Sequence, residues 1–157
     1  MVAPLSYPLN KAGVVELLQR HGILPTQQRI DIAHYLFQQP QHLSAEAVLE
    51  GVNDARHRVS KATVYNTLGL FVRAGLVREV LIDPERVFYD SNTAPHHHIY
   101  NLDTGELRDV QLAGVRVARL PELPAGTTLD SLELVVRVRN REDDPDQGQE
   151  DGQEDSA

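Results

Sequence analysis

Apolar residues in the first 75 positions recur at the spacing of an amphipathic helix in four separate stretches. Thr26, Ser44 and Ser60 stand where N-caps of the last three helices are expected, and Gly75 is placed to end the fourth. The four predicted core faces consist of Val14, Leu17 and Leu18; Ile30, Ala33 and Phe37; Ala45, Val48, Leu49 and Val52; and Val64, Leu68 and Phe71.

After Gly75 the pattern changes to short runs typical of strands. A hairpin of two strands is predicted directly after the fourth helix, and this order is that of a winged helix-turn-helix. Shorter strands follow. We therefore predict an α+β protein with a winged-helix domain over residues 1–90 and a small α/β domain over residues 91–140. The predicted strands cover residues 76–82, 87–89, 99–101, 106–110 and 132–139.

The acidic excess of the chain lies at its end. The net charge is −8, and residues 142–157 hold eight acidic side chains and no basic one, so the preceding residues are balanced. The composition of residues 141–157 predicts a disordered acidic tail, because it offers no large apolar side chain to bury. Such a tail keeps a protein in solution or competes with DNA for a basic surface. The neutral remainder leaves a nucleic-acid partner open.

Composition excludes several classes of protein. The chain has 157 residues and no cysteine, which rules out disulfides, thiol catalysis and a Cys-type structural zinc site. It contains neither an apolar run of about 18 residues nor a secretory signal, so we expect a cytoplasmic protein with no membrane partner. Without a zinc-protease HExxH motif or a Gly-rich phosphate loop, the sequence does not predict an enzyme.

The polar side of the fourth predicted helix suits the major groove of DNA. Small residues allow close approach, Thr63 and Tyr65 can meet thymine methyl groups, and Asn66 can pair with adenine. The alternative is a solvated face of a helical bundle. Residues 1–90 hold nine basic and nine acidic groups, so tight binding should require a dimer. Candidate phosphate contacts are Arg56, Arg58, Lys61, Arg73 and Arg78, and the expected DNA-binding set is Ser60, Lys61, Thr63, Tyr65, Asn66 and Arg73.

Three consecutive histidines precede a predicted strand. In a strand His96 and His98 would share one face and His97 the other, and two imidazoles at this spacing can hold a divalent metal or supply an axial ligand to haem. The alternative is exposed or satisfied side chains, which is how we interpret His21, His34 and His57. Carboxylates that could complete a metal site are Asp90, Asp103, Glu106 and Asp109, and His42 could reach it only through the fold.

Several of these segments together resemble the ferric uptake regulator family of metal-sensing transcription factors. The resemblance covers about residues 12–140. Within the family the chain is most similar to the iron response regulator branch, which lacks the zinc-holding cysteine pairs. The segments that carry the family resemblance are Gly22-Ile23-Leu24-Pro25-Thr26-Gln27-Gln28-Arg29, His42-Leu43-Ser44-Ala45-Glu46, Ser60-Lys61-Ala62-Thr63-Val64-Tyr65-Asn66-Thr67-Leu68 and the histidine cluster.

The resemblance implies functional residues at matching positions. Tyr65 and Asn66 match DNA-contacting positions of the recognition helix. The implied metal set is His42, His96, His98 and Asp109, with Tyr89 where the family has a further Glu ligand. The implied haem set is His96, His97, His98 and Tyr89, the last as an axial oxygen.

The resemblance also implies a function. It indicates a C-terminal dimerisation domain and a homodimer on double-stranded promoter DNA that controls iron and haem genes, with DNA binding weakened by haem. The alternative is a regulator whose DNA binding is activated by a divalent metal, namely Fe, Mn or Zn. Alternatives of another class are a haem- or metal-storage protein that does not touch DNA and, more remotely, a metallohydrolase.

Overall fold

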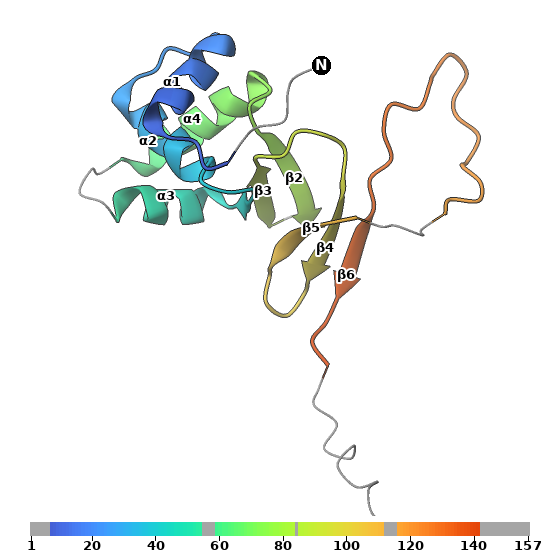
Figure 1. Ribbon diagram of the computed structural model, residues 1–157. Coiled ribbons are helices and arrows are strands. Elements are labelled where there is room, and N and C mark those ends of the chain that lie inside the picture. The colour runs from blue at the N-terminus through green and yellow to red at the C-terminus, as the bar shows by residue number, and fades with distance from the viewer. Residues whose placement is uncertain (1–6, 55–58, 84, 112–115, 142–157) are drawn as a thin grey trace, which may run out of the picture.

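The four expected helices form the N-terminal half of the protein. The structure is a computed structural model that describes residues 7–54, 59–83, 85–111 and 116–141. The helices are packed together at one end of the molecule (Figure 1). They are α1 (Lys11–Arg20), α2 (Gln27–Leu36), α3 (Ala45–Asn53) and α4 (Lys61–Arg73).

Side-chain caps fix where three of the helices begin. Asn10 accepts a hydrogen bond from the Gly13 amide, and Ser44 and Ser60 accept one from the third residue of α3 and α4. Thr26 precedes α2 as expected, but within the described chain its side chain makes no capping bond. Gly75 follows α4 with φ +70°, as a C-cap glycine does.

A three-stranded sheet closes the helical half, where the sequence predicted a hairpin of two strands. β2 (Arg78–Asp83) and β3 (Arg86–Asp90) form that hairpin, and β1 (His42–Leu43) pairs antiparallel with the other side of β3. A strand of two residues leaves no period in the sequence, so β1 could not be predicted. Its register places His42 opposite Asp90, at the end of the wing.

A first core lies between the helices and this sheet. It contains the predicted apolar faces of all four helices, and Tyr89 enters it from β3. A second, smaller cluster connects the outer face of the wing to the C-terminal half. Its members are Val80, Ile82, Phe88, Tyr100 and Leu107.

The C-terminal half is a second three-stranded sheet. It consists of β4 (His97–Asn101), β5 (Leu107–Val110) and β6 (Val135–Val138), in the order β5–β4–β6, with β6 parallel to β4. The Arg137 guanidinium donates a hydrogen bond of 2.6 Å to the Ile82 carbonyl and so connects this sheet to the wing. The division into domains at residues 90 and 91 stays a prediction.

The last strand is shorter than predicted, and part of its apolar surface is exposed within the described chain. Leu132, which precedes β6, is 40% exposed, and Val136 within the strand is 38% exposed. The preceding residues from 116 onward extend away from the two sheets (Figure 1). The predicted acidic tail, apart from Arg141, lies outside the described residues. Within those that are described, none of the helices has the length and apolar character needed to span a membrane.

Candidate functional site

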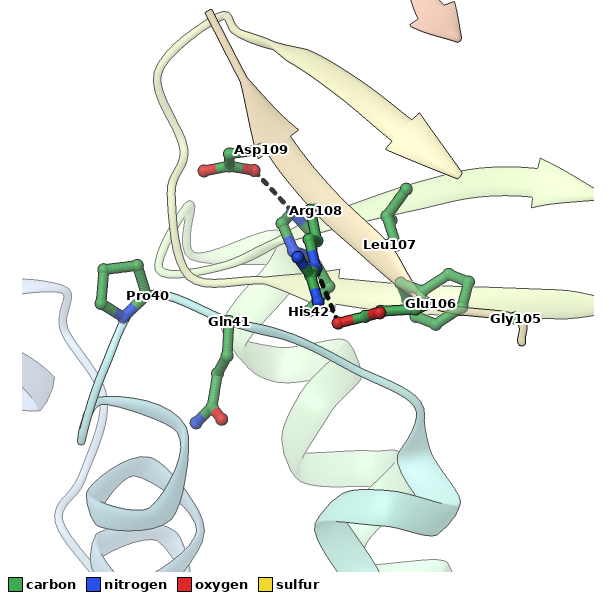
Figure 2. Close-up of a pocket in the computed structure, with 9 residues that line it drawn as sticks. Pro40, Gln41, His42, Gly105, Glu106, Leu107, Arg108 and Asp109 are labelled. Atoms are coloured by element: carbon green, nitrogen blue, oxygen red, sulfur yellow. Dashed lines mark hydrogen bonds and ion pairs between the residues drawn. The ribbon is translucent and has the colours of Figure 1, made fainter. Parts of the chain in front are cut away.

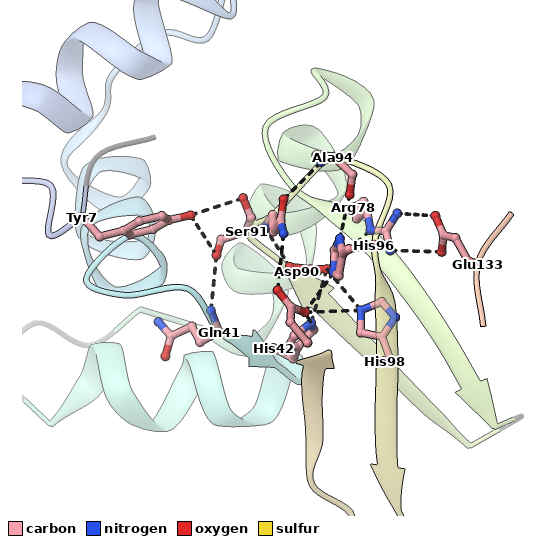
Figure 3. A network of polar contacts seen from close by, with 12 residues as sticks. Tyr7, Gln41, His42, Arg78, Asp90, Ser91, Ala94, His96, His98 and Glu133 are labelled. Carbon is pink, nitrogen blue, oxygen red and sulfur yellow. Dashed lines mark hydrogen bonds and ion pairs between the residues drawn. The ribbon is translucent and has the colours of Figure 1, made fainter. Parts of the chain in front are cut away.

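Five side chains from both halves of the fold converge beside the junction of the two sheets. His42 comes from β1, Asp90 from the end of β3, His96 from the segment before β4, His98 from β4 and Asp109 from β5. Strand pairing sets His42 opposite Asp90 and His98 opposite Asp109. Figure 3 shows the three imidazoles gathered around Asp90. We refer to these five residues as the histidine–aspartate cluster.

Each imidazole of the cluster lies between two carboxylate oxygens. Asp90 Oδ2 is 2.9 Å from Nε2 of His96, 3.3 Å from that of His42 and 3.5 Å from that of His98. Asp109 Oδ1 is 2.8, 2.9 and 3.6 Å from Nε2 of His42, His96 and His98, respectively. One ligand atom from each of the five residues lies within 4.8 Å of all the others. The five donors therefore surround one small volume.

The nitrogens at the centre of the cluster are buried and unsatisfied. Nε2 of His42, His96 and His98 faces the Asp90 and Asp109 oxygens at ion-pair distance, but within the part of the chain that the structure describes neither these nitrogens nor Nδ1 of His98 makes a hydrogen bond. A lone pair on a buried nitrogen that faces a carboxylate oxygen is repelled by it unless a proton or a cation lies between them. Three Nε2 atoms that face the same two carboxylates are what a cation site presents when its ligands are already in position.

Charge and burial hold the cluster in a form suited to a cation. Burial lowers the pKa of His98, and the neighbouring His96 and His42 lower it further, which favours the neutral imidazole. Burial acts to raise the pKa of Asp90, but the contacts with His42 and the Asn92 amide outweigh it and keep the pKa below its ordinary value. His98 therefore offers a lone pair on neutral nitrogen and Asp90 an ionised oxygen.

A second layer of contacts orients the ligands. The backbone amide of Asn92 donates to Asp90 Oδ1 at 2.7 Å, and its side-chain amide donates to Asp109 Oδ2 at 3.3 Å. Each carboxylate thus has one oxygen held by Asn92 and the other directed at the histidines. His96 Nδ1 donates to the Ala94 carbonyl at 2.6 Å, which leaves Nε2 as the lone-pair nitrogen.

The donor set fits a divalent transition-metal ion. Three imidazole nitrogens and two carboxylate oxygens match the preferences of Fe(II), Mn(II) and Zn(II), and the chain has no thiolate to offer a softer ion. A cavity of about 400 Å³ adjoins the cluster and is lined in part by His42 and Asp109 (Figure 2). The cavity therefore borders the cluster on the side of His42 and Asp109.

Asp90 takes the place at the cluster that the family resemblance assigned to Tyr89. Successive side chains of β3 point to opposite faces, so Tyr89 packs in the helical core while Asp90 faces the histidines. The other two carboxylate candidates have different partners. Asp103 accepts from Arg139 and the Asn140 amide, and Glu106 pairs with Arg108.

The four residues implied for haem are not brought together as one set. His97 is turned away from His96 and His98, and its Nδ1 accepts a hydrogen bond from the Leu134 amide at 3.2 Å. Tyr89 lies on the other face of β3 from the cluster. Only His96 and His98 converge, with ring centroids 4.5 Å apart.

The polar face expected on α4 is open to solvent. Lys61, Tyr65, Asn66 and Arg73 are exposed. Ser60 is exposed as the N-cap, and its hydroxyl also contacts that of the half-buried Thr63. The Tyr65 hydroxyl donates to Glu46 of α3, a contact the sequence did not indicate. That these residues bind DNA stays a prediction.

One candidate phosphate contact has another partner. Arg78 is directed at Asp90 and Glu133 (Figure 3), on the face of the wing that meets the C-terminal half, so its guanidinium is not free for a DNA backbone in this arrangement. Arg56 and Arg58 lie outside the described residues.

Comparison with known proteins places the chain in a family. A model of the ferric uptake regulator family matches residues 20–136. The peroxide-responsive repressor PerR of Staphylococcus aureus is 32% identical over 94 residues, which are 60% of this chain and 64% of the relative. The chain thus matches less than two thirds of the length of that repressor.

Solved structures agree with the family match. The ferric uptake regulator of Pseudomonas aeruginosa, solved with manganese, has a TM-score of 0.61 at 26% identity and covers 81% of this chain and 97% of its own. That of Vibrio cholerae has the same TM-score at 23% identity, with 80% and 98% covered, and supports the fold. The predicted α+β class, a winged helix with a C-terminal α/β domain, is confirmed, and the chain belongs to the ferric uptake regulator family.

Proposed function

We propose that this protein is a DNA-binding transcription regulator whose affinity for promoter DNA is set by a divalent cation held in the histidine–aspartate cluster. One observation carries the proposal. One ligand atom from each of five side chains, drawn from the winged-helix half and the C-terminal half, lies within 4.8 Å of the other four, and the buried imidazole nitrogens among them make no hydrogen bond within the described chain. The cation itself would supply the positive charge that holds both carboxylates and all three imidazoles at one point.

The position of the cluster explains how a cation would affect DNA binding. His42 and Asp90 belong to the sheet that closes the helical half, whereas His98 and Asp109 belong to the C-terminal sheet. Bound to all of them, an ion favours one relative placement of the two halves. A tenfold change in DNA affinity requires about 1.4 kcal/mol of difference between the bound and free states. Differential contacts of a single ion can provide that amount.

The exposed face of α4 supports the DNA-binding part of the proposal. Tyr65 and Asn66 project from the middle of the helix, and Lys61 and Arg73 stand near its two ends. In this proposal the first pair contacts bases and the second contacts phosphates. Because charges in this half balance, we propose that a homodimer binds two half-sites on palindromic promoter DNA. We propose that it works in the cytoplasm.

A divalent cation accounts for the cluster better than haem does. His96 and His98 converge on a single point that His42, Asp90 and Asp109 also face, and such a point accommodates an ion rather than a macrocycle. The haem mode of the iron response regulator branch, in which haem weakens DNA binding, is therefore our second candidate. The convergence of His96 and His98, whose ring centroids lie 4.5 Å apart, favours it.

Binding of selected DNA duplexes tests the proposal. Duplexes would be selected from a random pool by metal-free and by Mn(II)-loaded protein, and affinity measured by fluorescence anisotropy with Mn(II), Fe(II), Zn(II) or haemin added separately. We expect a divalent ion to change affinity at least tenfold. The double variant His96→Ala/His98→Ala should lose that response, while the control His34→Ala, on α2, should keep it. A response to haemin alone would support the second candidate instead.

The same assay separates the storage alternative. If the protein stores metal or haem without touching DNA, Tyr65→Ala and Arg73→Ala will not change the measured DNA affinity, and neither the metal-free nor the Mn(II)-loaded protein will enrich any duplex.

Hydrogen peroxide provides a further test, because the similar Staphylococcus aureus proteins are named peroxide-responsive repressors. Release of DNA by the Fe(II)-loaded protein on addition of hydrogen peroxide would extend the proposal to that signal.

A further inference from the structure

Arg78 places a positive charge at the edge of the histidine–aspartate cluster. It stands opposite Asp90 in the pairing of β2 with β3, and its Nε lies 3.4 Å from Asp90 Oδ2. This is the same oxygen that faces the three imidazoles. A cation bound through Asp90 and the Arg78 guanidinium therefore compete for one buried carboxylate oxygen.

Glu133 holds the rest of the guanidinium on the other side. Its two carboxylate oxygens accept from Nη1 and Nη2 of Arg78 at 2.6 and 3.1 Å, the two-pronged geometry in which arginine binds carboxylates most strongly (Figure 3). With both terminal nitrogens taken by Glu133, only the longer Nε contact reaches Asp90. Glu133 thus draws the positive charge away from the cluster.

The balance of charge follows from this arrangement. Asp90 and Asp109 together offer two negative charges to a divalent ion, and Arg78 with Glu133 forms a pair of zero net charge. If Glu133 were neutral, the Arg78 guanidinium would be free to donate two hydrogen bonds to Asp90. Its uncompensated positive charge would then repel a cation in the cluster. We infer that Glu133, acting through Arg78, sets the affinity of the histidine–aspartate cluster for a divalent cation.

The position of Glu133 makes this contact a connection between the two halves. The next residue, Leu134, accepts a hydrogen bond from the His98 amide at 3.0 Å, and Val135 pairs with His98 in the parallel β4–β6 ladder. Arg78 begins the wing. An ion that neutralises Asp90 releases Arg78 to Glu133 alone, so occupancy of the cluster strengthens a contact between the wing and the C-terminal sheet.

Mn(II) affinity of the full chain tests this inference, which rests on the proposed function. Affinity would be measured by electron paramagnetic resonance of free Mn(II) in the parent, Glu133→Gln, Arg78→Gln and the double variant. Glu133→Gln should bind Mn(II) roughly five- to tenfold more weakly. The control Glu16→Gln removes the same charge from an exposed ion pair with Arg20 on α1 and should leave the affinity unchanged.

A double-mutant cycle distinguishes tuning through Arg78 from a merely structural role. In the Arg78→Gln background the further change of Glu133 should alter Mn(II) affinity by less than about twofold, because the competing cation is gone. An equal loss in both backgrounds, or a Glu133→Gln affinity equal to that of Glu16→Gln, overturns the inference. If the parent binds Mn(II) no better than the His96→Ala/His98→Ala variant, the proposed cation site fails as well.

A second measurement needs no variant of Arg78. In protein labelled with ¹⁵N-arginine, saturation with diamagnetic Zn(II) should shift the Nε–H resonance of Arg78, because Asp90 turns its oxygen from that group to the ion. The Arg20 resonance provides the internal control. An Arg78 signal that Zn(II) leaves in place overturns the inference even if Arg78→Gln does not fold.

Discussion

Replacing Asp90 with Asn is the sharpest single test of the cluster. The substitution keeps the shape of the side chain and one oxygen but removes a buried negative charge that faces three imidazoles at 2.9 to 3.5 Å. Two unit charges about 4 Å apart interact by about 4 kcal/mol at an effective dielectric constant of 20. Because the Asn oxygen retains part of its attraction for a cation, we expect a loss of about 3 kcal/mol, or about 100-fold in Mn(II) affinity.

Competition with a fluorescent chelator measures that loss directly. Asp31→Asn is a matched control, since Asp31 is also largely buried and ion-paired, with Lys11, but lies on α2. We expect the control to bind Mn(II) like the parent. Equal affinities in the Asp90 and Asp31 variants would refute the assignment of Asp90 as a ligand, and with it the reasoning from strand alternation.

Three further outcomes are expected. Tyr65→Phe removes the hydroxyl hydrogen bond that chiefly lowers the pKa of Glu46, so the carboxyl titration of Glu46, followed by NMR, should move up toward 4.5. Any stability lost with that bond should be lost in full above pH 4.5, and the loss should disappear as the pH falls through the lowered pKa of the parent. Gly51→Ala sets a methyl group against the Tyr35 ring and should lower the free energy of unfolding by about 1–3 kcal/mol in urea; unchanged stability would show that the ring moves freely. Mn(II) at about 100 times its dissociation constant should raise the unfolding free energy by about 2.7 kcal/mol, and EDTA should reverse this.

The helical half could be predicted because its signals are local. Ser44 and Ser60 cap helices where the sequence indicated, and the apolar faces of all four helices meet in one core. Thr26 precedes α2 as predicted, but its side chain makes no capping hydrogen bond within the described chain, because the position before a helix does not by itself ensure one. β1 escaped prediction because its existence depends on pairing with β3, 46 residues or more further along the chain.

The cluster could be predicted only in part, for a related reason. The spacing of His96 and His98 and the period of two in strands gave the convergent pair. Residues 87–89 are all apolar or aromatic, so the sequence does not reveal which face of β3 meets the helices. That choice decides between Tyr89 and Asp90, and only the packing of the folded chain determines it. The role of Glu133 could not be predicted either, since it is 55 positions away from Arg78 in the sequence.

The brevity of β1 has a consequence for how the protein would respond to the proposed ion. A ligand on a long loop can adjust to its ion while the rest of the molecule stays still. The backbone at His42 has no such freedom, because Leu43 pairs with Tyr89 and Ser44 caps α3. Displacement of the imidazole must carry the first turn of α3 along or break the strand pairing. We therefore expect an abrupt change between two discrete arrangements rather than gradual bending.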